Sequence, residues 1–261
     1  MSSNAVKENR ISRQRRGAFT LIELLVVISV ISLLMAIAIP AFGKARASAY
    51  RITCSNRLRQ LQLCWQMYVN DQDDKVPLNL AAPISGVWRS TPSSWIGASS
   101  APHDPNTARI EIGSFFKGNY NRTMLLYRCP ADKTRVRSVA GVEFGMKRTR
   151  SYSMNANLGA PQAEQPVVYR ATAIRQPTRL FVFIDEHEDF IDDASFTVNP
   201  APGETWSNIP ADRHSQGCDF SFVDGHVEHW QWRYRKSRTQ GSQAEHEADL
   251  SDLKRLQAAT L

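Results

Sequence analysis

Hydrophobic and polar positions along the first quarter of the chain predict two consecutive helical segments. Residues 19–39 form an apolar run whose only charge is Glu23. As a helix this run is about 32 Å long, close to the thickness of a bilayer core, so it predicts a membrane-spanning helix. Residues 44–69 instead place apolar side chains three and four apart, which predicts an amphipathic helix lying on a globular domain. The positions of that stripe are Cys54, Leu58, Leu61, Trp65 and Tyr68.

Beyond residue 70 the pattern changes to loops and short strands. Residues 77–120 are rich in Pro, Ser, Gly and Asn, which predicts long surface loops. The clearest strand signal is a hairpin in which Asp224-Gly225 forms the turn between two apolar runs. The other candidate strands are residues 125–129, 150–156 and 179–185. Together these elements favour an α+β fold, a long N-terminal helix packed on an antiparallel sheet.

The C-terminal segment, residues 241–261, predicts a short helix or a tail. Ser242 and Glu245 have the spacing of a capping box. The whole chain therefore divides into a basic leader (1–18), a membrane helix (19–40), its amphipathic continuation (41–70), a β-rich domain (71–240) and this last segment (241–261).

Charge changes this picture only at the N-terminus. The net charge is +7, but the first 16 residues hold five basic side chains against one acidic. The remainder mixes both signs, so no specific nucleic-acid binding is expected. Basic residues before the apolar run place the N-terminus in the cytoplasm.

Three other interpretations of the apolar run are weaker. A cleaved secretory signal with the "ARA" site at 45–47 would have an unusually long apolar region and would place Lys44 and Arg46 at the cleavage site. A twin-arginine signal at 15–16 rests on that dipeptide alone, and the uninterrupted length with its basic flank argues against a buried core helix.

The segment "GAFTLIELLVVISVIS" resembles the prepilin cleavage and methylation segment of type IV pilins and type II secretion pseudopilins. In that family a prepilin peptidase removes the leader, usually after Gly and before Phe, and the new amino terminus is N-methylated. Glu23 and Pro40 have the family offsets when the cut falls between Ala18 and Phe19; a cut after Gly17 restores the glycine but shifts both offsets. We favour the Ala18/Phe19 cut, and Pro40 predicts a bend in the helix.

The resemblance implies partners, a location and a role for Glu23. The partners are the prepilin peptidase, an inner-membrane assembly platform with its cytoplasmic ATPase, and copies of the chain or other pseudopilins. The location is the bacterial inner membrane, crossed once, with the globular domain in the periplasm or in an extracytoplasmic filament. In the filament Glu23 would neutralise the amino terminus of a neighbouring subunit. The alternative is that its carboxylate simply reaches the headgroups.

A second resemblance covers the C-terminal half. "RHSQGCDFSFVDGHVE" is similar to the H-X9-DG segment of a pilin-like family of planctomycete and verrucomicrobial bacteria, with His214, Asp224 and Gly225 at the motif positions. "YRCPADK" (127–133) and "RSYSMNANLG" (150–159) resemble recurrent segments of the same family. The molecular activity of that family is poorly defined, so this match predicts an architecture rather than a reaction.

The cysteines predict an exported domain rather than a metal protein. Cys54, on the buried stripe, and Cys129, at the end of a candidate strand, are the expected disulfide pair; free buried thiols are the alternative. No CxxC spacing is present, so structural zinc is not expected. No cofactor is expected apart from calcium, which the pseudopilin resemblance suggests for an acidic run. The candidate calcium ligands are Asp185, Glu186, Glu188 and Asp189.

No enzymatic activity is expected. His226 and His229 are three apart on a predicted strand and therefore face opposite sides, and no HExxH, phosphate-loop or GxSxG motif is present. The sequence thus favours a pilin-like subunit that works by assembly, in a system that the sequence leaves open between secretion, adhesion and DNA uptake. The alternative is a monomeric membrane-tethered enzyme or carbohydrate-binding domain that uses Trp230 and Trp232.

Overall fold

The computed structural model describes residues 20–160, 167–236 and 241–261. The chain divides into two compact units, residues 1–45 and residues 46–261. Helix α1 (Leu21–Asp71) contributes its beginning to the first unit and its end to the second.

The beginning of α1 is a bare apolar helix. Its large hydrophobic side chains, from Leu21 to Ile39, are each about half exposed or more. Among the described residues α1 is the one helix long and apolar enough to cross a membrane, and its most apolar stretch has no buried residue. The helix continues through Pro40. The predicted bend at this proline stays a prediction.

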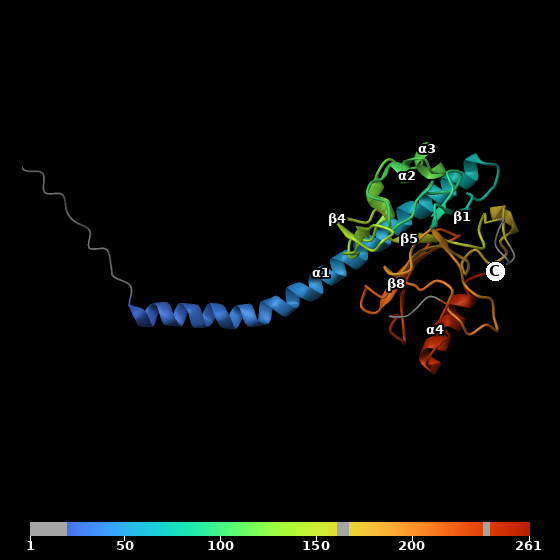
Figure 1. Cartoon of the computed structure of the whole chain (residues 1–261). Helices are drawn as coiled ribbons and strands as arrows, with labels where there is room; N and C mark the ends of the chain where they lie inside the picture. Colours follow the sequence, from blue (N-terminus) through green and yellow to red (C-terminus); the bar gives the residue numbers. More distant parts are fainter. Residues whose placement is uncertain (1–19, 161–166, 237–240) are drawn as a thin grey trace, which may run out of the picture. The chain divides into compact units, whose positions relative to one another are not determined.

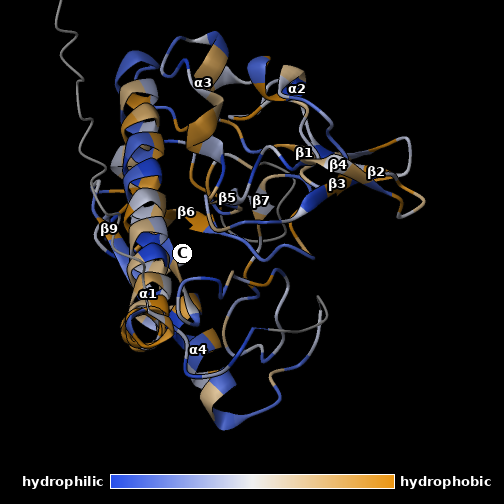
Figure 2. Cartoon of the chain, turned by 90° about the vertical axis from the view of Figure 1, so that its left-hand side faces the viewer, coloured by the Kyte–Doolittle hydropathy of each residue, from blue (hydrophilic) through white to orange (hydrophobic). Residues whose placement is uncertain are grey.

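The end of α1 is amphipathic and packs within the globular unit (Figure 2). Every residue of the predicted stripe except the half-buried Tyr68 is buried. The sequence periodicity had not placed Gln62, Cys64 and Val69 on this face, although they are buried with it. Asn56, Arg59 and Gln60 remain exposed, whereas Gln62 belongs to the buried face and its Oε1 accepts a hydrogen bond from the Ser221 hydroxyl of the sheet at 3.0 Å.

Five strands form the central sheet, in the order β7-β5-β6-β8-β9. Their bounds are β5 (Tyr152–Asn155), β6 (Phe181–Asp185), β7 (Ser195–Phe196), β8 (Gly217–Phe222) and β9 (Val227–Gln231). All pairs are antiparallel except β5 with β7, which is parallel. The long helix and this sheet confirm the α+β, pilin-like architecture.

Smaller elements surround the sheet. In the described part of the region between α1 and β6 there are two hairpins and four short helical turns. They are β1 (Ala81–Ile84), β2 (Val87–Ser90), α2 (Ala108–Glu111), α3 (Ser114–Lys117), η1 (Met124–Tyr127), β3 (Arg135–Arg137), β4 (Glu143–Lys147) and η2 (Ala171–Ala173). The strand predicted at 125–129 is wrong: this segment begins with the 3-10 turn η1, and the Thr123 hydroxyl accepts a hydrogen bond from the Leu125 amide at its start.

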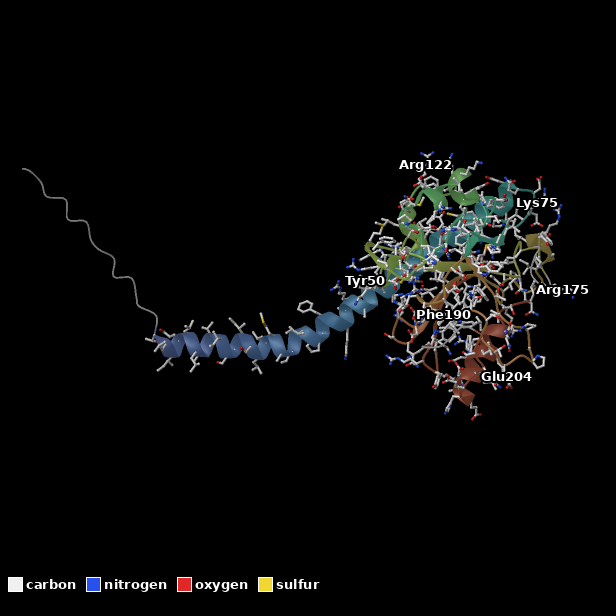
Figure 3. The ribbon with its side chains drawn as sticks, viewed as in Figure 1. Tyr50, Lys75, Arg122, Arg175, Phe190 and Glu204 are labelled. Carbon is white, nitrogen blue, oxygen red and sulfur yellow. The ribbon has the colours of Figure 1, made fainter. Side chains whose placement is uncertain are left out.

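Two hydrophobic clusters pack on the two faces of the sheet. Val182 and Phe183 of β6 join the cluster that contains the α1 stripe. Phe181 and Ile184 of the same strand join a second cluster with the C-terminal helix α4 (Glu247–Gln257). The sheet therefore separates α1 from α4, as Figure 1 shows. Charged side chains such as Lys75, labelled in Figure 3, lie outside both clusters.

Helix α4 begins later than its predicted capping box. Its N-cap is His246, which makes no side-chain capping bond, so the box at Ser242 and Glu245 is wrong. A buried ion pair fixes the helix instead. The Lys236 ammonium donates hydrogen bonds to Asp249 Oδ1 at 3.0 Å and to Asp252 Oδ2 at 2.8 Å.

Candidate functional site

The start of α1 is closed by a capping box that the sequence analysis missed. The backbone N–H and the hydroxyl of Thr20 donate to Glu23 Oε2 at 2.9 Å and 2.8 Å. In return the Glu23 N–H donates to Thr20 Oγ1 at 3.2 Å. A Thr followed three residues later by Glu is the sequence signal for this arrangement. In the single chain, then, the Glu23 carboxylate already has hydrogen-bond partners within its own helix.

The histidine and the Asp-Gly pair of the H-X9-DG segment lie at opposite ends of β8. His214 is buried before the strand, and its backbone N–H donates to Gly217 O at 3.2 Å. Asp224 and Gly225 form the turn after the strand, where Asp224 Oδ1 accepts the His226 N–H at 3.1 Å. The histidine and the aspartate therefore belong to two separate sites rather than to one catalytic pair.

At the Gly225 end of the segment, the backbone lies close to α1. Gly225 has a φ of +101°, and a Cβ there would lie 2.8 Å from Gln66 Nε2. Glycine is favoured at such a backbone angle because it has no side chain to clash. This end of the motif is thus explained by the turn and by its packing on the helix.

The His214 end lies in a buried cluster with Cys54, Cys129 and Asp185. One ligand-type atom from each of these side chains lies within 4.8 Å of the other three. His214 Nε2 is 3.1 Å from Cys129 Sγ and 3.9 Å from Asp185 Oδ2, and Cys54 Sγ is 3.8 Å from that same oxygen. All four side chains are buried. Among the described residues this is the one group of His, Cys and acidic side chains arranged closely enough to hold a metal.

Arg213 provides the positive charge beside this cluster. Its Nη2 donates to Asp185 Oδ1 at 2.6 Å and its Nε to Oδ2 at 3.2 Å. Burial raises the pKa of Asp185 to about 6, even though Arg213 acts to lower it. Burial would also raise the pKa of Cys129, but hydrogen bonds with Cys54 and His214 and the charge of Arg213 bring it down to about 7.

Comparison with known families finds a match at the beginning of the chain. Residues 13–39 match the prokaryotic N-terminal methylation motif. The chain carries a prepilin-type methylation motif. Its long N-terminal helix and its α+β domain give the chain a pilin-like architecture. No curated protein and no solved structure matches the chain.

The expected processing residues of this pilin-like chain, Gly17, Ala18 and Phe19, lie outside the described residues. The choice between the two cleavage points therefore stays a prediction. The expected Cys54–Cys129 disulfide also stays a prediction: both thiols are free in the structure, although their sulfur atoms lie in the same cluster.

The acidic run does not converge on a common point. Arg213 lies between two of its members, because Nη1 donates to Glu188 Oε2 at 2.5 Å while Nη2 binds Asp185. Glu186 is buried and accepts the Asn208 side-chain amide at 2.6 Å. Asp189 is exposed. Each of these carboxylates thus has a different environment, and calcium binding stays a prediction.

Neither tryptophan proposed for sugar stacking offers an exposed ring. Trp230 and Trp232 are buried in the cluster beneath α4, and Trp232 Nε1 donates to Ala211 O at 2.8 Å. The Arg255 guanidinium lies over Trp230, 3.9 Å from the ring centroid. A stacking platform made of these two rings is therefore ruled out by their burial.

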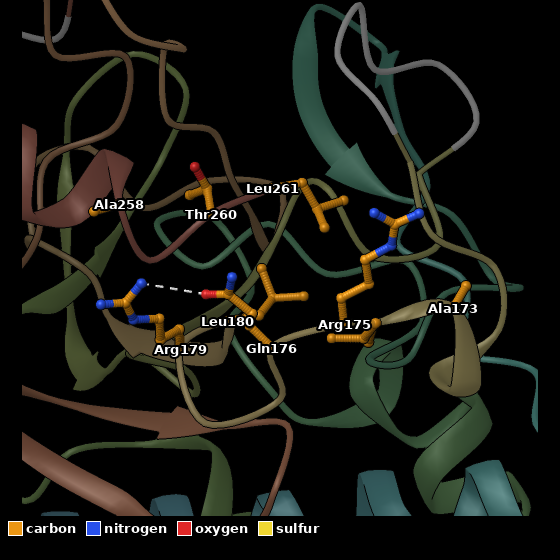
Figure 4. Close-up of a pocket in the computed structure, with 9 residues that line it drawn as sticks. Ala173, Arg175, Gln176, Arg179, Leu180, Ala258, Thr260 and Leu261 are labelled. Carbon is orange, nitrogen blue, oxygen red and sulfur yellow. Dashed lines mark hydrogen bonds between the residues drawn. The ribbon is translucent and has the colours of Figure 1, made fainter.

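One cavity of about 360 Å³ lies near the C-terminus, between the η2 region and the end of α4. Figure 4 shows Arg175 and Arg179 at its wall, where Arg179 Nη1 donates to Gln176 Oε1 at 3.3 Å. The Thr260 and Leu261 side chains line another part. No residue of the buried Cys-His-Asp cluster lines this cavity, and it holds no described His, Cys or acidic side chain.

Proposed function

We propose that the chain is a pseudopilin-like subunit, processed by a prepilin peptidase and assembled into a filament of the type II secretion or type IV pilus kind. The observation that carries the proposal is the methylation motif at 13–39, which overlaps the start of a helix whose large apolar side chains are exposed in the described part of the chain. The apolar surface of such a helix is buried either by lipid or by other copies of the helix. Assembly would move the helix from the lipid bilayer into contact with other copies of itself.

Glu23 is the residue we propose to direct this transfer. A charge inside the hydrocarbon core costs about 2.5–3.5 kcal/mol near its centre and less near its edge. The capping box with Thr20 reduces that cost before assembly, because it gives the carboxylate two donors. In the filament the amino terminus of a neighbouring subunit would supply a full positive charge, which makes a stronger partner than an uncharged donor. Glu23 would then exchange a local bond for an intermolecular one.

The proposed protein is not an enzyme and works through its contacts. Its partners are the prepilin peptidase, the inner-membrane platform with its ATPase, and copies of itself or other pseudopilins. It would sit in the bacterial inner membrane with its N-terminus in the cytoplasm and its globular unit outside.

Intact mass and N-terminal sequencing of the membrane-fraction protein test the processing step. Coexpression with a prepilin peptidase is expected to give a chain that begins at N-methylated Phe19, and omission of the peptidase to leave the leader in place. A chain that begins at residue 48 in the soluble fraction would contradict the proposal, because it would identify an ordinary secretory signal. A chain that the peptidase leaves uncut would favour the alternative of a membrane-tethered binding domain or enzyme.

Filament formation tests the role of Glu23. We expect Glu23→Gln to lose at least about tenfold in the amount of sheared filament, because the amide has no negative charge for the incoming amino terminus. Glu204→Gln is the matched control, since Glu204 is exposed on the globular unit (Figure 3). Immunoblots of the membrane fraction show whether each variant is made and inserted. Normal assembly by Glu23→Gln would refute this role.

A further inference from the structure

We propose that Cys54, Cys129, Asp185 and His214 form a closed structural zinc site that ties α1 to the sheet. This inference goes beyond the proposed function and does not depend on filament assembly.

The ligand atoms come from four segments that are far apart in the sequence. Cys54 lies on α1, Cys129 follows η1, Asp185 ends β6, and His214 precedes β8. Tetrahedral zinc with ordinary bonds to sulfur, nitrogen and oxygen separates its ligand atoms by about 3.3–3.8 Å. The separations here are 3.1, 3.8 and 3.9 Å for three of the pairs, and at most 4.8 Å for all. Adjustments of up to about 1 Å in the widest separation would therefore bring the four atoms onto one ion.

The chemistry of the donors selects the metal. Two thiolates, one imidazole and one carboxylate suit zinc, whereas calcium and magnesium prefer sites made of oxygen atoms. The four side chains are at most 3% exposed, which leaves no room for a water or substrate as a further ligand. A closed four-ligand site of this kind stabilises a fold and performs no catalysis.

The charges at the cluster also favour a dication. With a metal bound, both cysteines would be thiolates, and together with the Asp185 carboxylate they would carry three negative charges, which Zn²⁺ and the adjacent Arg213 would balance. Arg213 holds the carboxylate through both of its oxygens, at 2.6 Å and 3.2 Å. The Tyr152 hydroxyl lies 2.9 Å from Cys54 Sγ, where it would donate to the thiolate. Such outer contacts orient the ligands of known metal sites.

A Cys54–Cys129 disulfide is the competing arrangement, because it would use the same two sulfur atoms. It requires only those atoms, and it would leave unexplained why an imidazole nitrogen and a carboxylate oxygen approach them to 3.1 Å and 3.8 Å. The zinc site uses all four groups. Zinc and the disulfide are mutually exclusive, so one sample distinguishes them.

Elemental analysis of the full-length chain, purified in detergent without chelators, tests the site. We expect about one zinc per chain and four free thiols after denaturation. His214→Gln and Cys129→Ser are expected to lose the zinc, whereas His226→Gln and Cys64→Ser, which change the same residue types outside the cluster, are expected to keep it. Retention of zinc by the His214→Gln and Cys129→Ser variants would overturn the assignment.

Two further measurements keep the test independent of variants that fail to fold. Cobalt(II) added to the metal-depleted wild-type chain is expected to bind in a 1:1 ratio and to give the visible absorption of a tetrahedral thiolate complex. A denatured chain that is about 2 Da lighter than its reduced form, with two free thiols, would establish the disulfide and overturn the proposal. A chain with four free thiols that takes up neither zinc nor cobalt would overturn it as well.

Discussion

Lys236 offers the sharpest test of how the C-terminal helix is held. Its ammonium group is fully buried, lies between Asp249 and Asp252 of α4, and sits 4.5 Å and 5.0 Å from the ring centroids of Trp206 and Trp232. Lys236→Met keeps most of the side-chain volume but removes the charge that balances two buried carboxylates. Removing one partner from a buried ion pair costs about 3–5 kcal/mol of unfolding free energy.

Urea unfolding of the full-length chain in mild detergent, followed by tryptophan fluorescence, measures this cost. With a slope of about 2 kcal/mol per molar urea, a loss of 4 kcal/mol lowers the midpoint by about 2 M. Lys254→Met is the matched control, because Lys254 is an exposed lysine of α4. Its effect should remain within about 0.5 kcal/mol.

A compensated variant tests the cause of the loss. Lys236→Met combined with Asp249→Asn and Asp252→Asn leaves no uncompensated charge, and the amide oxygens still accept hydrogen bonds. We expect it to recover about 2 kcal/mol relative to Lys236→Met alone. If Lys236→Met unfolds at the same urea concentration as Lys254→Met, the ion pair does not hold α4, and the reasoning is refuted.

Two other predictions follow from single residues. Gly225→Ala should lower the unfolding free energy by about 1–3 kcal/mol, because the φ of +101° at this position strains any side chain and the new Cβ meets Gln66. Gly145→Ala is the control, because the space around Gly145 is open. Equal urea midpoints for the two variants would contradict the explanation. Cys64 should resist iodoacetamide at pH 8, because burial raises its pKa to about 11 and leaves about one thiolate in a thousand. Its alkylation should accelerate about tenfold per pH unit up to that pKa in the folded chain, and rapid labelling at pH 8 would show that the thiol is not buried.

The elements that could be predicted from the sequence are those defined by local spacing. The α1 stripe follows from a helical period of 3.6 residues, and the β8–β9 hairpin follows from Asp224-Gly225 between two apolar runs. The parallel pairing of β7 could not be predicted, because this strand has only two residues and its partner β5 is distant in sequence. Short segments of this kind take their conformation from tertiary packing.

The buried cluster could not be predicted for a related reason. Zinc motifs are recognised when ligands recur at short intervals, as in CxxC. Here Cys54, Cys129, Asp185 and His214 are separated by tens of residues, and only the folded sheet and helix bring them together. The H-X9-DG resemblance did mark His214, but it grouped that residue with Asp224, which lies at the other end of β8. The capping box of Thr20 and Glu23, by contrast, has a local sequence signal, because a Thr followed three residues later by Glu is enough to indicate it.

That capping box bears on how reversible a polymer of this chain would be. A subunit that leaves the filament can return the Glu23 carboxylate to the Thr20 N–H and hydroxyl, so it re-enters the bilayer without an unpartnered charge. Capping bonds of this type contribute about 0.5–2 kcal/mol, which offsets part of what the intermolecular pair contributes. The cohesion of the filament would then come mainly from its apolar helices, while Glu23 sets the stagger between neighbours. Released subunits would remain competent for another round of growth.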